Sequence, residues 1–154
     1  MAVTVSIDLS RTFSVTSSPD ASFDLLSDVP RSVSHFPKVD KLVDLGDNAY
    51  RWEMQKIGID KYSIQTIYAC KYMSDKKAKR IWWTPVSGVG NGVVQGSWKI
   101  SAAGGGSKIE FEAKGELTLP LPGLAKLVVT PVVRREFAGM VDRYIENLKK
   151  TLGT

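Results

Sequence analysis

Residues 124–152 read LAKLVVTPVVRREFAGMVDRYIENLKKTL, and they carry the clearest pattern in the chain. Apolar side chains recur there at three- and four-residue spacing, at Phe137, Met140, Val141, Tyr144, Ile145, Leu148 and Leu152. This spacing is typical of one face of an amphipathic helix. Lys149 and Lys150 lie at the C-terminal end, where the helix dipole favours cations. The pattern predicts a long C-terminal helix that packs its apolar face against other elements.

The segment before this helix contains residues that break regular structure. Pro120, Pro122 and Gly123 exclude a strand that runs directly into the helix. Pro131 interrupts the helical pattern, so we expect either a kink there or a short first helix over residues 124–129.

The composition is that of an ordinary globular protein. The chain has 154 residues, 43% of them hydrophobic and 24% charged, so we expect one domain over residues 1–154. No apolar run approaches the roughly 20 residues that a membrane span needs, and the first residues lack the features of a signal peptide. Cys70 is the only cysteine, which excludes an intramolecular disulfide and favours a reducing compartment. We therefore expect a cytoplasmic protein.

The N-terminal part of the chain predicts a strand followed by two short helices. Residues 3–15 alternate between apolar and polar, which indicates a half-buried strand. Ser18 is a candidate N-cap, and Pro19 suits the first helical position. We expect Pro30 to end this helix and residues 31–36 to form the second one.

Residues 39–119 predict about six antiparallel strands, because short alternating runs are separated by turn residues. One expected strand covers residues 62–72, and Asn91-Gly92 is a strong signal for a hairpin turn. Together with the first strand, these runs indicate an α+β fold. Its parts are a curved antiparallel sheet of about seven strands, two short helices after strand 1 and a long C-terminal helix.

Several stretches carry a resemblance to a known superfamily. They are SPDASFDLL at residues 18–26, Val29-Pro30, Phe36-Pro37, VVQGSW at residues 93–98, and the closing helix with Leu148 and Leu152. With the order of the elements, they resemble the helix-grip fold of the START/Bet v 1-like (SRPBCC) superfamily. The nearer likeness is to its bacterial polyketide cyclase/dehydrase and lipid-transport branch, whose relatives include coenzyme Q-binding proteins and the G subunit of carbon monoxide dehydrogenase. The resemblance implies a hydrophobic ligand held between the sheet and the long helix.

Aromatic side chains are the candidate ligand contacts. The candidates from the sheet and the helix are Tyr50, Trp52, Tyr62, Tyr68, Trp83, Trp98, Phe137, Met140 and Tyr144. Tyrosines combine an apolar ring with a polar tip, which suits a pocket that holds an apolar molecule at a few polar points. The alternative is that these rings only fill a core, and the resemblance favours the cavity. The expected partner is a small hydrophobic ligand such as a lipid, a quinone or a polyketide-like molecule.

The sequence carries no catalytic, cofactor-binding or metal-binding signature. His35 is the only histidine, so we expect a structural or solvent-exposed histidine rather than a metal ligand or a catalytic base. Cys70 falls on the apolar face of its predicted strand, which predicts a buried, unreactive thiol. A strand pattern follows the glycine-rich loop over residues 88–92, so this loop predicts a hairpin rather than a phosphate-binding site.

Two other functions are compatible with the same fold. A polyketide aromatase/cyclase-like enzyme would use a tyrosine or His35 as its acid–base group, but Arg51 and Arg80 are predicted to face outward, away from the cavity. A membrane-associated assembly factor, resembling the carbon monoxide dehydrogenase relative, would use two segments, the cation-rich turn over residues 76–80 and the apolar residues 119–124.

The alternative without a function is that residues 76–80 form a solvated turn and residues 119–124 form a buried connection between a strand and the helix. The second segment would otherwise serve as a gate or as a transient membrane contact. Nucleic acid is excluded as a partner, because the net charge is only +5 and the aromatic residues fall on apolar faces.

Overall fold

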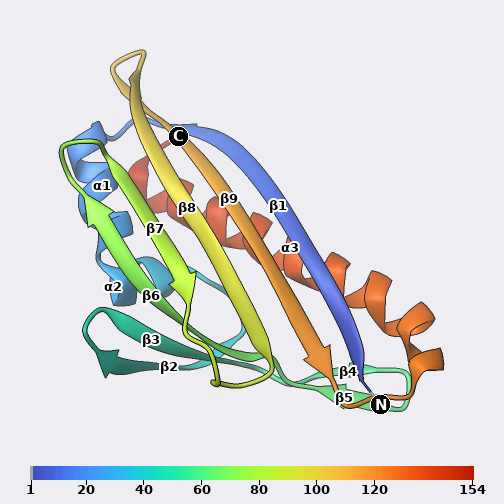
Figure 1. Ribbon diagram of the computed structural model, residues 1–154. Helices are drawn as coiled ribbons and strands as arrows, with labels where there is room; N and C mark the ends of the chain where they lie inside the picture. The colour runs from blue at the N-terminus through green and yellow to red at the C-terminus, as the bar shows by residue number, and fades with distance from the viewer. Residues whose placement is uncertain (1) are drawn as a thin grey trace.

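The computed structural model describes residues 2–154, in which a curved antiparallel sheet wraps a long helix (Figure 1). The strands are β1 (Val3–Val15), β2 (Val39–Gly46), β3 (Ala49–Met54), β4 (Ile57–Ile59), β5 (Tyr62–Ile64), β6 (Ile67–Asp75), β7 (Arg80–Pro85), β8 (Gly92–Ala103) and β9 (Gly106–Leu119). The helices are α1 (Pro19–Ser27), α2 (Val29–Val33), the 3-10 turn η1 (Gly123–Ala125) and α3 (Lys126–Leu152). The predicted α+β fold is confirmed.

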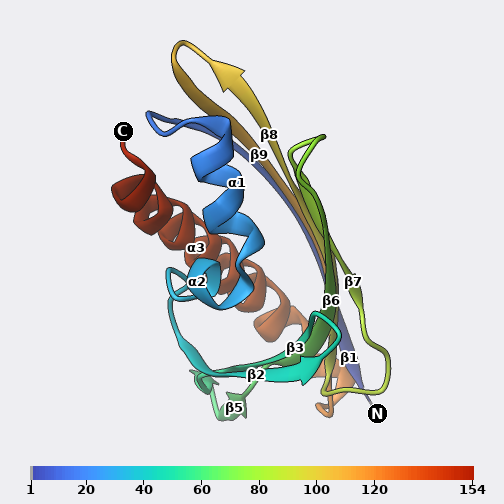
Figure 2. The same cartoon turned by 90° about the vertical axis from the view of Figure 1, so that its left-hand side faces the viewer.

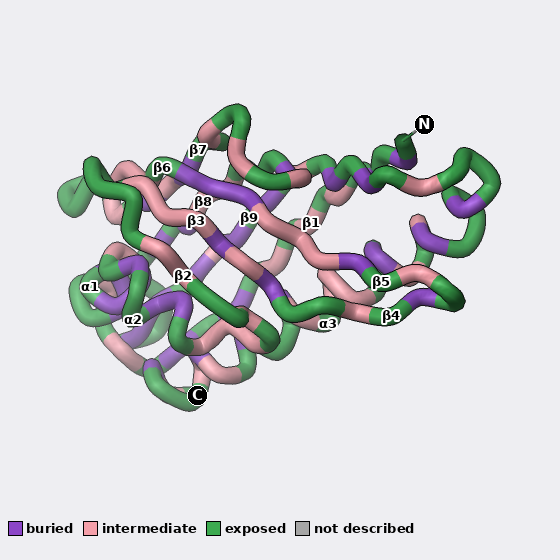
Figure 3. The backbone as a smooth tube through the Cα atoms, turned by 90° about the horizontal axis from the view of Figure 1, so that it is seen from below, coloured by how far each residue is buried: buried purple, intermediate pink, exposed green. Residues whose placement is uncertain are grey.

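Seven strands form the main sheet, in the order β1-β9-β8-β7-β6-β3-β2, and β4 and β5 form a separate hairpin. All three α-helices lie on the concave side of the sheet (Figure 2). The β4–β5 hairpin lies at the end of the molecule opposite to α1 and α2 (Figure 3). The molecule therefore has two distinct ends, with α3 running between them.

The first strand pairs with the last one along its whole length, from Val3 opposite Leu119 to Val15 opposite Ser107. Directly after β1, the Thr16 and Ser17 amides donate hydrogen bonds to the carbonyls of Gly153 and Leu152, at 3.1 and 3.0 Å. These two bonds fasten the C-terminal end of α3 to the end of β1.

The two short helices follow β1 as predicted, but their boundary differs. The Ser18 hydroxyl accepts a hydrogen bond from the Ala21 amide at 3.1 Å, so the predicted N-cap is confirmed. The prediction that Pro30 ends α1 is wrong, because Pro30 is the second residue of α2, whose N-cap is Asp28. Proline is tolerated in a first helical turn, where its missing N–H has no helical partner to lose.

The predicted strand over residues 62–72 is also wrong, because it breaks after Ile64 and pairing resumes at Ile67. The Gln65 amide donates to the Met54 carbonyl at 2.9 Å, and the Ile67 N–H donates to the Asn91 side-chain oxygen at 2.9 Å. These side-chain bonds accompany a backbone bond from the Met54 amide to the Thr66 carbonyl at 3.0 Å, and β5 leaves the main sheet.

The predicted hairpin turn over residues 88–92 is confirmed, because residues 86–91 connect the paired strands β7 and β8, but Asn91-Gly92 is not the centre of this turn. The positive φ angles in this loop belong to Gly88 and Gly90, at 80° and 69°, whereas Asn91 is not among the residues with positive φ. Asn91 uses its side-chain amide to hold the β5–β6 break instead, donating to the Gln65 carbonyl at 2.7 Å.

Helix α3 continues through Pro131 from Lys126 to Leu152, so the separate first helix over residues 124–129 does not form. Pro131 has no N–H for the carbonyl of Leu127, the residue four positions earlier. Leu127 is exposed, so water can satisfy this carbonyl at little cost.

Buried apolar side chains form two clusters. The larger one lies between the sheet and the C-terminal two-thirds of α3, and it includes the residues around Trp98, Val141 and Leu148. The smaller one holds the β4–β5 hairpin against the start of α3, and it includes Ile59, Ile64, Leu117, Val129 and Val133. The start of α3 is therefore anchored by a cluster of its own.

Gly96 lies under the Trp83 ring, opposite it on the neighbouring strand. An added Cβ at Gly96 would lie 2.3 Å from Trp83 Cζ2 and 2.5 Å from the Glu112 carbonyl oxygen. We expect Gly96→Ala to lower the free energy of unfolding by about 1–3 kcal/mol, because this crowding displaces the indole or the strand. Urea denaturation measures the change.

Gly139 provides the matched control, because it lies inside α3 with no atom within 4 Å of an added Cβ. Gly139→Ala should raise the free energy of unfolding by roughly 0.5–1 kcal/mol through helix propensity. Equal stability of the two variants would contradict the close packing of Trp83.

Candidate functional site

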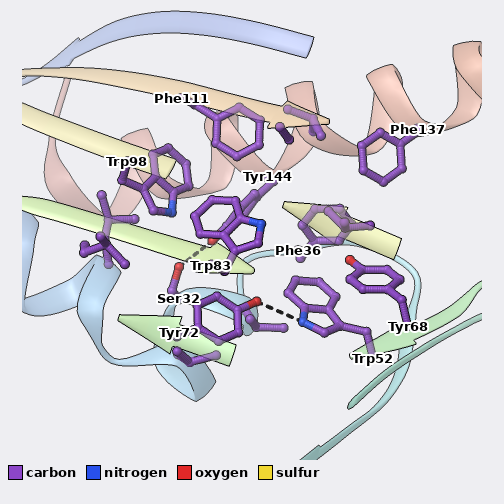
Figure 4. A pocket seen from close by; sticks show the side chains of 17 residues that line it. Ser32, Phe36, Trp52, Tyr68, Tyr72, Trp83, Trp98, Phe111, Phe137 and Tyr144 are labelled. Carbon is purple, nitrogen blue, oxygen red and sulfur yellow. Dashed lines mark hydrogen bonds between the residues drawn. The ribbon is translucent and has the colours of Figure 1, made fainter. Parts of the chain in front are cut away.

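Aromatic rings from five strands, β3, β6, β7, β8 and β9, meet the middle of α3 under the curve of the sheet (Figure 4). The Trp52 and Tyr68 rings stack, with centroids 5.4 Å apart and an interplanar angle of 18°. The centroid of the Trp98 ring lies 4.7 Å from that of Phe111 and 5.7 Å from that of Tyr144 on α3. Such offset and edge-on pairs are the favoured arrangements of aromatic rings. They place a nearly continuous aromatic wall against α3.

Two hydrogen bonds orient polar tips within this wall. Trp52 Nε1 donates to the Tyr72 hydroxyl at 3.0 Å. The Ser32 and Tyr144 hydroxyls share a second bond, which ties α2 to α3. Both bonds satisfy groups that would otherwise be buried without partners.

The Tyr68 hydroxyl differs from the other polar groups of the wall. The side chain is 4% exposed, and its hydroxyl forms no hydrogen bond within residues 2–154. In Figure 4 it points inward among the rings rather than out to solvent. It is a polar atom available to a molecule that enters the site.

Burial keeps these groups neutral. Loss of solvent raises the pKa values of Tyr68 and Tyr72 well above the ordinary value, and it also raises the pKa of Tyr144, although the bond from Ser32 opposes it. Burial raises the pKa of the Cys70 thiol to about 12. At neutral pH these four side chains are therefore uncharged, and the tyrosines act as hydrogen-bonding groups rather than as bases.

Two small cavities lie along α3, each of about 40 Å³. They share four wall residues, Tyr68, Val94, Ala113 and Phe137. Pockets that hold drug-sized ligands occupy roughly 300–1,000 Å³, so each cavity has room for only a few water molecules. The rings pack closely, and a larger molecule requires part of the shared wall to move.

The candidate residues distribute unevenly between the two cavities. The first cavity is lined by six of them, namely Trp52, Tyr68, Trp83, Trp98, Phe137 and Tyr144, and Phe137 and Tyr68 also line the second. Met140 lines only the second cavity. Tyr50 and Tyr62 line neither. The Tyr50 ring packs on Tyr72 towards the surface, and Tyr62 belongs to the β4–β5 hairpin.

Eleven of the 17 residues that line the first cavity were not among the candidates, and they include Ser32, Phe36 and Phe111. Phe111 follows the alternating pattern of β9, so that pattern could have identified it. Ser32 and Phe36 line the cavity because α2 docks against α3, which no local pattern reveals.

The remaining candidates for chemistry lie outside the first cavity. His35 Nε2 lies 2.8 Å from Thr151 Oγ1 and its Nδ1 lies 3.0 Å from the Arg31 carbonyl oxygen, so the ring connects α2 to α3. Cys70 is buried, as predicted. Arg51 pairs with Glu53 at 2.9 Å, and the Arg80 guanidinium lies 5.6 Å from the centre of the Trp82 ring. Within residues 2–154, no group of three or more potential ligands is placed to hold a metal ion.

The cation-rich turn over residues 76–80 lies beside α1. Lys76 pairs with Asp24 at 3.2 Å, and Lys79 pairs with Asp20 at 2.8 Å. The turn is therefore partly neutralised, and it lies far from residues 119–124, which lead into α3 at the other end of the molecule (Figure 1). No helix in the described part of the chain is long and apolar enough to span a membrane.

One comparison with known proteins shows the family of this chain. The family described as polyketide cyclase / dehydrase and lipid transport matches residues 6–153, whereas no curated protein matches the chain. The fold is similar to that of a protein from Thermus thermophilus, with a TM-score of 0.66 and 15% identity over 96% of each chain.

Two further structures share the helix-grip fold. A START superfamily protein from Mycobacterium smegmatis has a TM-score of 0.65 and 16% identity over 94% of this chain and 96% of its own. The Zhui aromatase/cyclase from a Streptomyces species has a TM-score of 0.59 and 12% identity over 96% and 91%. At these identities, the likeness shows the fold alone.

The buried tyrosines and Cys70 should make the protein less stable at alkaline pH. Their folded-state pKa values lie above those of the unfolded chain, so above about pH 9–10 the unfolded state binds fewer protons than the folded state. The contribution of these groups to the free energy of unfolding should be constant below that range and should then fall as the pH rises, by up to about 1.4 kcal/mol per pH unit for each group. Urea denaturation across this pH range measures it.

Tyrosinate absorbance gives an independent reading of the same groups. The signal of Tyr68, Tyr72 and Tyr144 should appear only as the protein unfolds. Ionisation of every tyrosine in a protein that keeps its native circular dichroism would contradict the burial of these three side chains.

Proposed function

We propose that this chain, which belongs to the polyketide cyclase/dehydrase and lipid transport family, binds a small hydrophobic molecule between the sheet and α3. The proposal rests on one observation, the unpartnered Tyr68 hydroxyl inside an aromatic and aliphatic wall. The residues that line the first cavity, all within the described part of the chain, carry no formal charge. An apolar molecule with one polar group matches this wall.

The Tyr68 hydroxyl supports a specific kind of ligand. The Tyr68 hydroxyl forms no hydrogen bond within the described residues, and a phenol can donate or accept one. A carbonyl, hydroxyl or ester oxygen on the ligand would give it a partner, while the rings contribute apolar contact. Lipids, quinones and polyketide-like molecules all combine these features.

The site gains space if Phe137 moves. Phe137 is half-buried on α3 and forms part of the wall between the two cavities. Displacing its ring would join them into one chamber under the middle of α3. Met140, which lines the second cavity, has a flexible thioether side chain that adapts to different ligand shapes.

The tyrosines of this wall do not provide a general base. Burial keeps the Tyr68 and Tyr144 hydroxyls protonated at neutral pH, so neither removes a proton from a bound molecule. His35 contacts Thr151 outside both cavities.

Native mass spectrometry of protein purified from its own host tests the proposal. A stoichiometric apolar molecule, identified after denaturing extraction, would support it. A brominated fatty acid provides a second test, because three of the four tryptophans line the first cavity and bromine quenches their fluorescence on contact. A ligand-free mass together with no quenching would contradict the proposal.

Tyr68→Phe separates ligand binding from stability. We expect this variant to keep its free energy of unfolding within about 0.5 kcal/mol, because no hydrogen bond of the chain is lost. It should bind the brominated fatty acid up to about tenfold more weakly, which is the worth of one hydrogen bond. Fluorescence titration and urea denaturation measure the two quantities.

Tyr72→Phe is the matched control, because it leaves Trp52 Nε1 without its acceptor. It should lower the free energy of unfolding by about 1–3 kcal/mol. Unchanged affinity in Tyr68→Phe would show that this hydroxyl does not contact the ligand.

Phe137→Ala tests whether the two cavities join. The variant should take up the brominated fatty acid faster and more tightly than the unchanged protein, while it loses about 1–3 kcal/mol of stability as a half-buried ring is removed. Stopped-flow quenching measures the uptake. Leu42→Ala, a half-buried position outside both cavities, should lose stability without faster uptake. Equal uptake in the two variants would argue against Phe137 as the partition.

A further inference from the structure

The start of α3 presents apolar side chains to solvent. Leu124 and Leu127 are 86% and 82% exposed, and Val128 is 47% exposed. Positions three and four residues apart lie on the same side of a helix, so these three side chains form one surface, here named the apolar tip. Most exposed large apolar residues of a protein are scattered singly, whereas contiguous ones mark an interaction surface.

The apolar tip projects from a firmly held base. Ala125 and Val129 directly follow Leu124 and Val128 in the sequence. They are buried against the β4–β5 hairpin in the smaller apolar cluster. Side chains that are more than four-fifths exposed lie on a convex surface rather than in a groove. A convex tip needs a partner that deforms around it, and a fluid lipid layer does so without a preformed pocket.

Positive charge surrounds the apolar tip. The nearby cations, here named the basic collar, are all exposed and come from the β4–β5 hairpin, the residue before it and α3: Lys56, Lys61, Lys126, Arg134 and Arg135. Residues 117–135 contain no acidic residue. The nearest carboxylates are Asp60 at the hairpin turn, Glu116 on β9, and Glu136, which pairs with Lys38.

The cations of the basic collar are not paired with carboxylates. Within the described residues, none of the five takes part in a salt bridge. At the opposite end, α1 carboxylates pair with Lys76 and Lys79, although Lys77 and Lys108 have no salt bridge in the described part of the chain. Uncompensated positive charge therefore accompanies the exposed leucines, and it is complementary to an anionic surface.

We propose that the apolar tip and the basic collar dock on the surface of an anionic phospholipid bilayer. The leucines enter the boundary between headgroups and acyl chains, and the cations bind the lipid phosphates around them. A second copy of the chain fits this surface less well, because a tip-to-tip contact would bring two basic collars together. The contact needs no ligand in the cavities, so it is independent of the proposed function.

Vesicle flotation with the full chain and no added ligand tests the docking. We expect binding to vesicles of phosphatidylcholine and phosphatidylglycerol, and at least tenfold weaker binding to phosphatidylcholine alone or at high salt. The double variants Leu124→Ser/Leu127→Ser and Lys61→Glu/Lys126→Glu should each reduce binding at least tenfold. All four side chains are exposed, so thermal unfolding should remain close to that of the unchanged protein.

A second charge-reversal variant distinguishes the effect of the basic collar on vesicle binding from the effect of net charge. Lys77→Glu/Lys108→Glu changes the net charge equally, at exposed positions far from the apolar tip, and should leave binding within twofold. The proposal is overturned if the unchanged protein does not float with anionic vesicles, or if both charge reversals weaken binding equally. A dimer in solution that Leu124→Ser/Leu127→Ser dissociates, without vesicle binding, would identify the tip as a self-association surface instead.

Discussion

The apolar concave face of the seven-stranded sheet must be covered, and α3 provides most of the cover. The helix is fastened at its two ends by different means. At its start, Val129 and Val133 pack on the β4–β5 hairpin, and at its end the backbone of residues 152–153 bonds to the end of β1. The first cavity lies under the stretch between these anchors, whereas the second reaches the hairpin anchor, where Ile64 and Val133 line it. The fold therefore leaves the aromatic part of the site beneath the middle of the helix.

Hydrogen bonds between polar side-chain atoms, as well as contacts between rings, determine the arrangement of the aromatic wall. The bonds from Trp52 to Tyr72 and between Ser32 and Tyr144 determine how large side chains fill a narrow space. Gly96 lets the Trp83 ring lie close to the neighbouring strand. This dense packing leaves cavities of only about 40 Å³ each. Such a wall gives a ligand well-oriented contacts, and movement of the partition adds to the cost of binding.

The sequence predicted elements with strong periodicity and missed features that depend on distant partners. Helix α3 and strand β1 repeat their patterns over many residues, so both were predicted nearly to their ends. Alternation continues through Gln65 and Thr66, so it could not reveal the break that Asn91 stabilises from the β7–β8 turn. Six of nine candidate residues line the first cavity, because alternation assigns the face of a strand and three- and four-residue spacing assigns the face of α3. The cavity volume depends on rotamers and on the docking of α2, which periodicity does not determine.

The pairing of β1 with β9 has a consequence for synthesis on the ribosome. Strand β1 is made first, yet its only partner in the sheet ends at Leu119. The strands from β2 to β8 can pair with neighbours as they emerge, whereas β1 keeps both edges unpaired until most of the chain has been made. Unpaired strand edges are prone to pair with other chains. The alternating polar residues of β1, which include Asp8 and Arg11, help to keep this strand soluble while it is unpaired.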